Sequence, residues 1–159
     1  MNQSNLSKWL KGIVIGMAVF CAGIYGGILP VCGQSLASYA PEFAHCFLPW
    51  MIFLLITAVP VFIALIFAWK IFTEIGRNNS FSFINARYLK NIAHLAIIDT
   101  VYFFLGNVVM LFANQSHSGI LLASLLIDFL GIAVAVVCAA LSHLVYKAAV
   151  INEENELTI

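Results

Sequence analysis

The chain has 159 residues, of which 63% are hydrophobic and only 9% are charged, and its formal net charge is zero. Soluble domains carry about 25% charged residues, so this composition excludes an ordinary soluble protein and indicates an integral membrane protein. The length suits one domain, residues 1–159, and the balanced charge gives no reason to expect direct binding of nucleic acid or acidic substrates.

Four apolar stretches are long enough to cross a bilayer, because a transmembrane helix needs about 20 mostly apolar residues. They cover residues 12–31, 47–69, 92–113 and 120–146. Two lysines precede the first, as in a signal peptide, but signal peptides have an apolar core of only about 7 to 15 residues, so we expect this stretch to be retained. The sequence predicts an all-α fold, a four-helix transmembrane bundle with up-down-up-down topology.

Basic residues indicate the orientation of the four spans, because they accumulate in cytoplasmic loops. All of them lie before the first span, between the second and third, or after the fourth: Lys8, Lys11, Lys70, Arg77, Arg87, Lys90 and Lys147. The other two loops, 32–46 and 114–119, contain none. Both termini are therefore predicted to be cytoplasmic, with residues 147–159 as a cytoplasmic tail.

Two of the cysteines, Cys32 and Cys46, fall in the first outer loop, where a disulfide can persist. A thiol oxidoreductase of the four-helix membrane type is one interpretation of this pair. The chain contains no Cys-x-x-Cys motif, however, and a pair without it carries little redox information. We therefore favour structural or free cysteines.

The first span carries a stripe of glycines. At about 100° per residue, Gly12, Gly16, Gly23 and Gly27 fall within roughly 60° of one another. Such a stripe lets another helix backbone approach closely, but it does not say to which chain that backbone belongs. Packing inside the same bundle is the favoured interpretation, and homodimerisation is the alternative.

The fourth span has a face of small residues that includes Asp128, and charged residues in spans almost always face the bundle interior. A short turn near residue 116 makes the third and fourth spans antiparallel neighbours. Counting from that turn puts Asp128 at the level of residues 105–107. Asn107 can donate to a carboxylate and is therefore the expected partner of Asp128.

Asp99, in the third span, is expected to face the second span or the bundle centre. Pro60 in the second span leaves a carbonyl without its helical amide partner, and the hydroxyl of Thr57 is close to it in sequence. Two roles remain open for Asp99 and Asp128: a proton or cation site, as in a small transporter, or interhelical hydrogen bonding that fixes the bundle. The structural role is favoured, because four short spans leave little room for an alternating-access pathway.

Motifs for catalysis or cofactor binding are absent from the sequence. The histidines are not spaced in a way that brings them together as metal or haem ligands. No His-Glu-x-x-His, phosphate-binding glycine loop or Ser-His-Asp order occurs. We therefore predict a protein that is not an enzyme and has no cofactor or metal.

The second loop and the end of the chain carry two distinctive short motifs. They are the pattern Gly76, Phe81-Ser82, Asn85-Ala86, Leu89 and the ending Glu154-Asn155-Glu156-Leu157-Thr158-Ile159. In both, the chain resembles the small bacterial four-span membrane proteins called domain of unknown function 2975, with Glu156 where the family's ending has Asp. The resemblance implies no catalytic residue. It implies a sensor or anchor in the bacterial cytoplasmic membrane that partners a small Cro/CI-type helix-turn-helix regulator.

The loop and the tail together form the predicted contact surface for this regulator. Its residues are Phe81, Phe83, Asn85, Leu157, Thr158 and Ile159. We expect the fourth helix to carry an extended tail into the cytoplasm, where the tail adds to a sheet edge or enters an apolar pocket. Docking back onto the loop aromatics and a frayed terminus are the alternatives.

Overall fold

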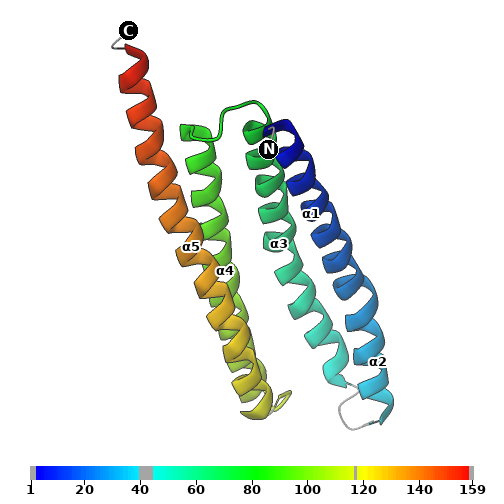
Figure 1. Cartoon of the computed structure of the whole chain (residues 1–159). Helices are drawn as coiled ribbons and strands as arrows, with labels where there is room; N and C mark the ends of the chain where they lie inside the picture. Colours follow the sequence, from blue (N-terminus) through cyan, green and yellow to red (C-terminus); the bar gives the residue numbers. More distant parts are fainter. Residues whose placement is uncertain (1–2, 40–44, 117, 158–159) are drawn as a thin grey trace.

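The computed structural model describes residues 3–39, 45–116 and 118–157, and its elements are all helical (Figure 1). They are α1 (Gln3–Gly23), the short π-helix η1 (Ile24–Ile28), α2 (Leu29–Tyr39), α3 (Phe47–Gly76), α4 (Phe83–Phe112) and α5 (Ser118–Leu157). Four helical segments are long and apolar enough to cross a membrane: Gln3–Ser35, Phe47–Gly76, Phe83–Phe112 and Ser118–Asn155. The predicted all-α fold with four spans is confirmed, and the described ranges contain no strand.

Each helix runs beyond the apolar span predicted for it, because capping rather than the apolar boundary ends a helix. After α3, Asn78 has a φ of 60°, the left-handed conformation in which asparagine often stops a helix. Before α4, the hydroxyl of Ser82 accepts a hydrogen bond of 3.4 Å from the backbone amide of Asn85. At the other end α2 continues to Tyr39, so Cys32 lies in a helix rather than in the predicted outer loop.

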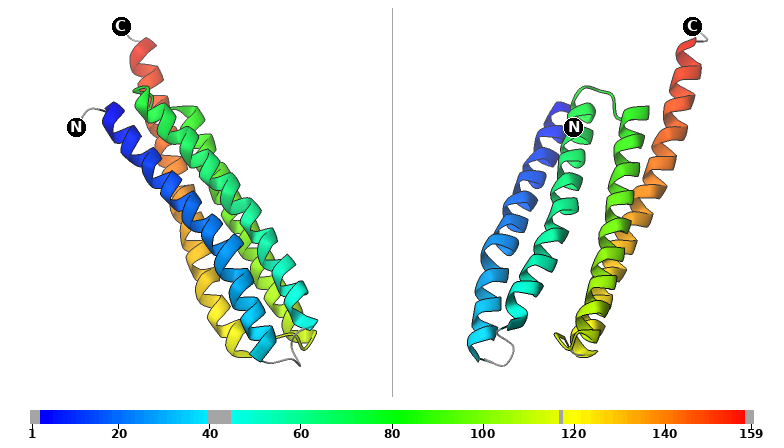
Figure 2. Two further views of the ribbon diagram at one scale, coloured as in Figure 1. Left: turned by 90° about the vertical axis from the view of Figure 1, so that its right-hand side faces the viewer. Right: turned by 180° about the vertical axis from the view of Figure 1, so that it is seen from behind.

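Neighbours along the chain are neighbours in space (Figures 1 and 2). The α1–η1–α2 segment packs against α3, α3 against α4, and α4 most extensively against α5. Among the described helices, the backbones of α1 and α5 do not approach each other, so the four spans form an open array rather than a closed ring. Both ends of the chain lie at the same end of the array, as up-down-up-down topology requires.

The aromatic core lies between α3 and α4 around Phe53, which is 5% exposed. The Phe53 ring stacks on Phe103 with centroids 5.7 Å apart and contacts Trp50 edge-on. A Cβ on Gly106 would clash with the Phe53 ring, so glycine is what lets α4 approach α3 at this level. The outer faces of all four spans carry exposed large apolar side chains, the surface expected of a protein surrounded by lipid.

The glycine stripe of the first span does not pack inside the chain, contrary to the favoured interpretation. Gly12, Gly16, Gly23 and Gly27 are exposed, and a Cβ added to any of them would meet nothing within 4 Å. The opposite face of α1 turns toward α3, because the Ser7 hydroxyl donates to the carbonyl of Phe72 there. Polar side chains, rather than the glycines, thus decide which face of α1 packs.

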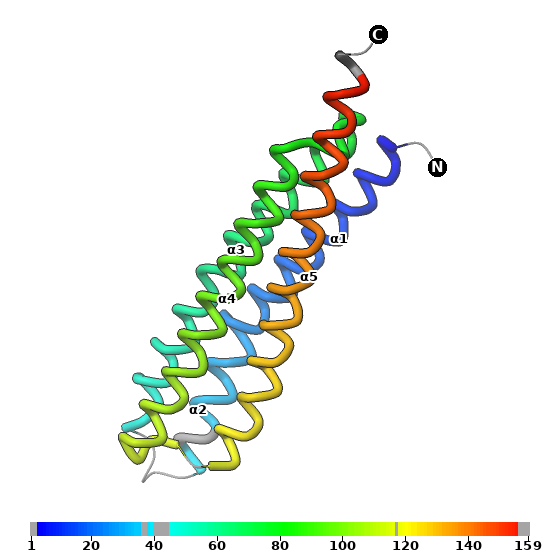
Figure 3. Tube along the Cα trace, turned by 90° about the vertical axis from the view of Figure 1, so that its left-hand side faces the viewer, coloured from blue at the N-terminus to red at the C-terminus, as the bar shows by residue number. Residues whose placement is uncertain are grey.

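The extended tail predicted for the chain end is also wrong as far as the structure describes it. α5 remains helical through Leu157, and Figure 3 shows this helix continuing past the ends of the others. The segment Lys147–Leu157 is rich in good helix formers, which explains why the helix does not stop at the last apolar turn. Thr158 and Ile159 lie outside the described residues.

Candidate functional site

The most closely packed interface lies between α4 and α5 (Figure 3). The face of α5 that meets α4 consists mainly of small residues, including Ser124, Gly131 and Ala135, and Ala135 is 1% exposed. A Cβ on Gly131 would clash with the hydroxyl of Thr100 on α4. Nearer the chain ends, Ser142 donates a hydrogen bond of 2.7 Å to the carbonyl of Ala86. Small residues allow this close approach of two helix backbones.

The register of α4 against α5 differs from the predicted one by about two residues, roughly half a helical turn. With Thr100 opposite Gly131, counting along both helices places Asp128 midway between the levels of Thr100 and Asn107, and Ser124 at the level of Asn107. The sequence-based count centred the turn near residue 116, whereas α4 ends at Phe112 and α5 begins at Ser118, which centres the turn near residue 115. The expected bond between Asp128 and Asn107 is not formed, because Asn107 donates instead to the carbonyl of Phe103 on its own helix, 2.8 Å away.

Asp128 and Asn107 are nevertheless both buried in this interface, at 6% and 1% exposure. In the described part of the chain, neither carboxyl oxygen of Asp128 has a hydrogen-bond partner, and the amide oxygen of Asn107 also has none. Buried polar atoms usually have partners, and unpaired ones in hydrocarbon cost several kcal/mol. The α4–α5 interface thus contains several oxygen acceptors that no protein donor satisfies.

Asp99 lies in a different interface, on the side of α4 that faces α3 and η1. It is close enough to interact electrostatically with Tyr25 of η1 and Tyr102 of its own helix. One of its carboxyl oxygens is buried without a partner among the described residues. The two aspartates therefore do not form one site: Asp99 belongs to the α3 side of α4 and Asp128 to the α5 side.

A second polar cluster joins η1 to α3 beside Asp99. The hydroxyl of Tyr25 lies 3.0 Å from that of Thr57, which in turn donates to the carbonyl of Leu54 at 2.7 Å. Because the Thr57 proton is used there, Tyr25 is the donor to Thr57. Tyr25 sits in the π-helical turn, and Pro60 interrupts the hydrogen bonding of α3 one turn away. The π-helical turn of η1 thus lies beside the irregular part of α3 around Pro60.

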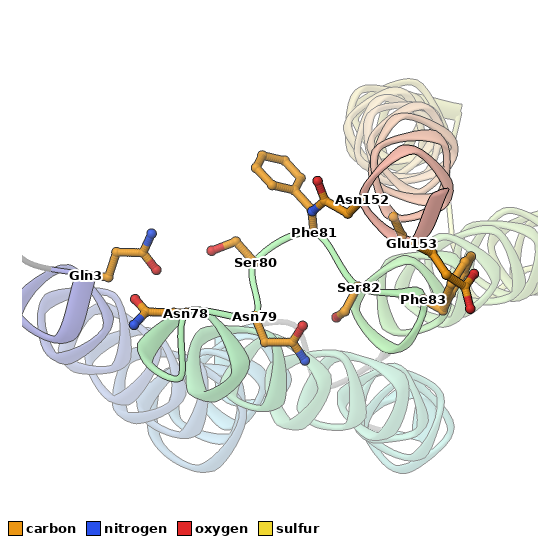
Figure 4. Close-up of a pocket in the computed structure, with 10 residues that line it drawn as sticks. Gln3, Asn78, Asn79, Ser80, Phe81, Ser82, Phe83, Asn152 and Glu153 are labelled. Carbon is orange, nitrogen blue, oxygen red and sulfur yellow. The ribbon is translucent and has the colours of Figure 1, made fainter. Parts of the chain in front are cut away.

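We call the end of the molecule that holds both chain ends and the turn at residues 77–82 the basic end, because all Lys and Arg residues lie in this turn or in the helix halves nearest to it. There the start of α1, the turn and the end of α5 enclose a polar hollow of about 370 Å³ (Figure 4). Its lining includes Gln3, Asn78, Ser80, Phe81, Asn152 and Glu153. Amides, hydroxyls and one carboxylate thus surround an aromatic ring.

The three loop residues predicted to contact a partner have different surroundings. Phe81 is 57% exposed and lines the hollow, whereas Phe83 packs edge-on against Tyr146 of α5, with ring centroids 5.3 Å apart. Asn85 is only 1% exposed, and its amide donates to the carbonyls of Asn79 and Ser80, each 3.0 Å away. Asn85 therefore holds the turn in shape rather than presenting itself to a partner. The side chain of Leu157 lies outside the described part of the structure, like Thr158 and Ile159.

The model of the family described as "Protein of unknown function (DUF2975)" matches residues 31–159, which include α3, α4 and α5. The chain belongs to this family. It is also 30% identical over 149 residues to a protein of Bacillus subtilis (strain 168) named "Uncharacterized membrane protein YoaS", with 92% of each chain covered. No solved structure matches the chain. The family resemblance inferred from the loop and the chain end is thereby confirmed, and the chain is an integral membrane protein.

Several polar residues of this DUF2975 protein were missed by sequence reasoning. Tyr25 gives a signal in retrospect, because a tyrosine followed by Gly26-Gly27 inside an apolar span marks a place where the helix can deform. Thr100 gives a weaker signal, since hydroxyl residues in spans commonly bond to their own helix. In the described ranges the structure shows free cysteines and no group of His, Cys, Asp or Glu that can hold a metal.

Proposed function

We propose that this protein is a sensor or anchor in the bacterial cytoplasmic membrane that holds a helix-turn-helix regulator at its basic end. The observation that carries the proposal is the length of α5: it has 40 residues, whereas α3 and α4 have 30 each. At about 1.5 Å per residue, the ten additional residues extend α5 by roughly 15 Å. A helix that leaves the bilayer in this way offers a platform that a purely lipid-embedded protein does not need.

The hollow beside this platform supports a polypeptide partner. Phe81 offers a large exposed apolar surface, and amide and hydroxyl groups such as Asn78, Ser80 and Asn152 surround it. An apolar anchor with a polar rim is the usual composition of a protein interface. Asn85 fixes the turn that carries Phe81, so the ring is presented by a preorganised segment.

The proposal is tested by co-purification from native membranes. The chain carries an affinity tag, and the cytoplasmic protein recovered with it is identified in wild type, in Phe81→Ser and in Phe112→Ser. Phe112 is the matched control, because it is an 83% exposed phenylalanine at the opposite end of α4. We expect a helix-turn-helix protein with wild type and Phe112→Ser and a loss of at least tenfold with Phe81→Ser. Equal recovery in all three, or none in wild type, would contradict the proposal.

The proposal also requires the basic end to face the cytoplasm, which the distribution of Lys and Arg supports. Cys32 is exposed at the opposite end of the array, whereas Cys46 is 5% exposed. An impermeant thiol reagent applied outside intact cells should therefore label wild type and should not label Cys32→Ser. Labelling that appears only after the membrane is permeabilised would indicate the opposite orientation. The basic end would then face away from the cytoplasm, which contradicts the regulator proposal.

A small proton- or cation-coupled transporter is the second candidate, favoured by the unpaired carboxyl oxygens of Asp99 and Asp128. The two residues lie in different helix interfaces, so transport would need ions to pass across α4. Flux into proteoliposomes that depends on both carboxyls, abolished by Asp99→Asn and by Asp128→Asn in folded protein, would favour transport over the regulator anchor.

A further inference from the structure

Donors and acceptors are unequally distributed in the α4–α5 interface. At the level of Asp128, the polar side chains of the interface donate to carbonyls of their own helices. Thr100 donates to Ala96, Asn107 to Phe103 and Ser124 to Leu121, each at 2.8 Å. The acceptors that remain are oxygen atoms only: both carboxyl oxygens of Asp128 and the amide oxygen of Asn107, none of which has a partner in the described structure.

No cationic side chain faces these oxygens. α4 is the one described helix that packs against α5, and the groups it presents at this level are Thr100 and Asn107. The nearest titratable groups on α4, Tyr102 and Asp99, carry no positive charge and face α3 or η1. His94 and His143 are exposed and lie toward the basic end, two or more turns away. A bare carboxylate surrounded by acceptors in a membrane interior is unstable, so a positive charge from outside the chain is needed.

We propose that the α4–α5 interface binds one univalent cation, a proton or Na⁺, on the carboxylate of Asp128 and the amide oxygen of Asn107. The hydroxyl oxygens of Thr100 and Ser124 still have free lone pairs, because each uses its hydrogen toward its own helix. Hard oxygen ligands suit protons and alkali cations rather than soft transition metals. A single carboxylate balances a single positive charge, which favours a univalent occupant over a divalent one.

Occupancy of this site links the two helices. The occupant neutralises Asp128 where α5 meets α4, and the same α5 carries the part of the chain that leaves the membrane. Without the cation, the carboxylate is repelled by the neighbouring acceptors, and the hairpin should loosen. The inference concerns binding within the hairpin and does not depend on the regulator proposed above.

The experiment measures thermal unfolding of the purified protein in detergent. NaCl is compared with choline chloride at equal ionic strength, and the pH is varied separately in choline chloride. Both series use the Asp99→Asn chain, so that Asp128 is the one carboxyl left in the middle of a span. We expect a saturable rise in Tm of roughly 5 to 10 °C, as for a ligand at about a hundred times its dissociation constant. A rise with Na⁺ at fixed pH identifies Na⁺, and a rise only with acidification identifies the proton.

The additional substitution Asp128→Asn should abolish the response, because the neutral amide needs no cation. Asn107→Ala is the second variant: it keeps the carboxylate and removes one oxygen ligand, so the midpoint of the response should shift at least tenfold in cation concentration. If Asp128→Asn does not fold, the shift of the midpoint in Asn107→Ala tests the proposal by itself. A Tm that is insensitive to both Na⁺ and pH, or a response that survives unchanged in the variants, would overturn the proposal.

Discussion

Two helices of this protein carry a stripe of small residues, and only one of these stripes packs within the chain. On α5, Gly131 meets Thr100 so closely that a Cβ would clash, and Ala135 is 1% exposed. On α1, Gly16 and Gly23 meet nothing within 4 Å. The spacing of the two stripes is similar, so spacing alone does not determine which of them forms a helix contact.

The polar residues of the two helices explain the difference. On α5, Ser124 and Asp128 lie on the same face as the small residues, and that face turns toward α4, where Ser124, Asp128 and Ala135 are buried. On α1, Ser7 and Tyr25 lie on the face opposite the glycines and bond to α3. Leaving polar groups toward lipid costs free energy, whereas a glycine can face lipid at little cost. The polar residues therefore orient each helix, and a small-residue stripe packs only when it shares their face.

The largest effect is expected when a leucine is introduced into each of the two small-residue stripes. Gly131→Leu should destabilise the protein by about 1 to 3 kcal/mol or more, because the new side chain overlaps Thr100 on α4. Gly16→Leu is the matched control and should leave stability unchanged within about 0.5 kcal/mol, since nothing lies near it. Chemical or thermal unfolding in detergent measures both. A Gly16→Leu variant as unstable as Gly131→Leu would mean that another chain covers α1.

A smaller effect is expected at the turn of the basic end, which Asn85 at the start of α4 holds in shape. Asn85→Ala removes two hydrogen bonds and leaves the carbonyls of Asn79 and Ser80 without their donor, which should cost about 1 to 2 kcal/mol. Asn152→Ala, an exposed asparagine of the same hollow, should have no measurable effect on unfolding. Similar Tm values for the two variants would contradict the structural role assigned to Asn85.

The bond between η1 and α3 should have a still smaller effect. Tyr25→Phe removes the hydrogen bond to Thr57 and keeps the ring, and interhelical hydrogen bonds in membranes average only about 0.6 kcal/mol. Tyr39→Phe is the control, because Tyr39 is 90% exposed. We expect a lower Tm for Tyr25→Phe alone. If the two variants unfold alike, the Tyr25–Thr57 contact does not orient α1.

These residues also show how far the sequence predicts the molecule. Apolar length alone predicts four spans, and an aspartate in a span predicts an inward face. The predicted level of Asp128 against α4 was wrong by about two residues, roughly half a turn, because it depends on where the turn between the helices is centred, and residue types do not determine that. The π-helix around Tyr25 was not predicted at all, since a single wide turn arises from tertiary contacts with α3 rather than from helix propensity.

The smallest effect on stability is expected at the end of α5, which contrasts with the same helix inside the membrane. Among the residues of α5 whose side chains the structure describes, Ala149 is the last buried one, at 4% exposure, and Ile151 is already 57% exposed. Deleting residues 157–159 should therefore leave the Tm unchanged within about 1 °C, because no buried contact of the described chain is lost. The same deletion should reduce recovery of the helix-turn-helix protein if the end of α5 is part of its contact surface. A lowered Tm would instead mean that the chain end folds back onto the basic end, and unchanged Tm with unchanged recovery would confine the contact surface to Phe81 and the hollow.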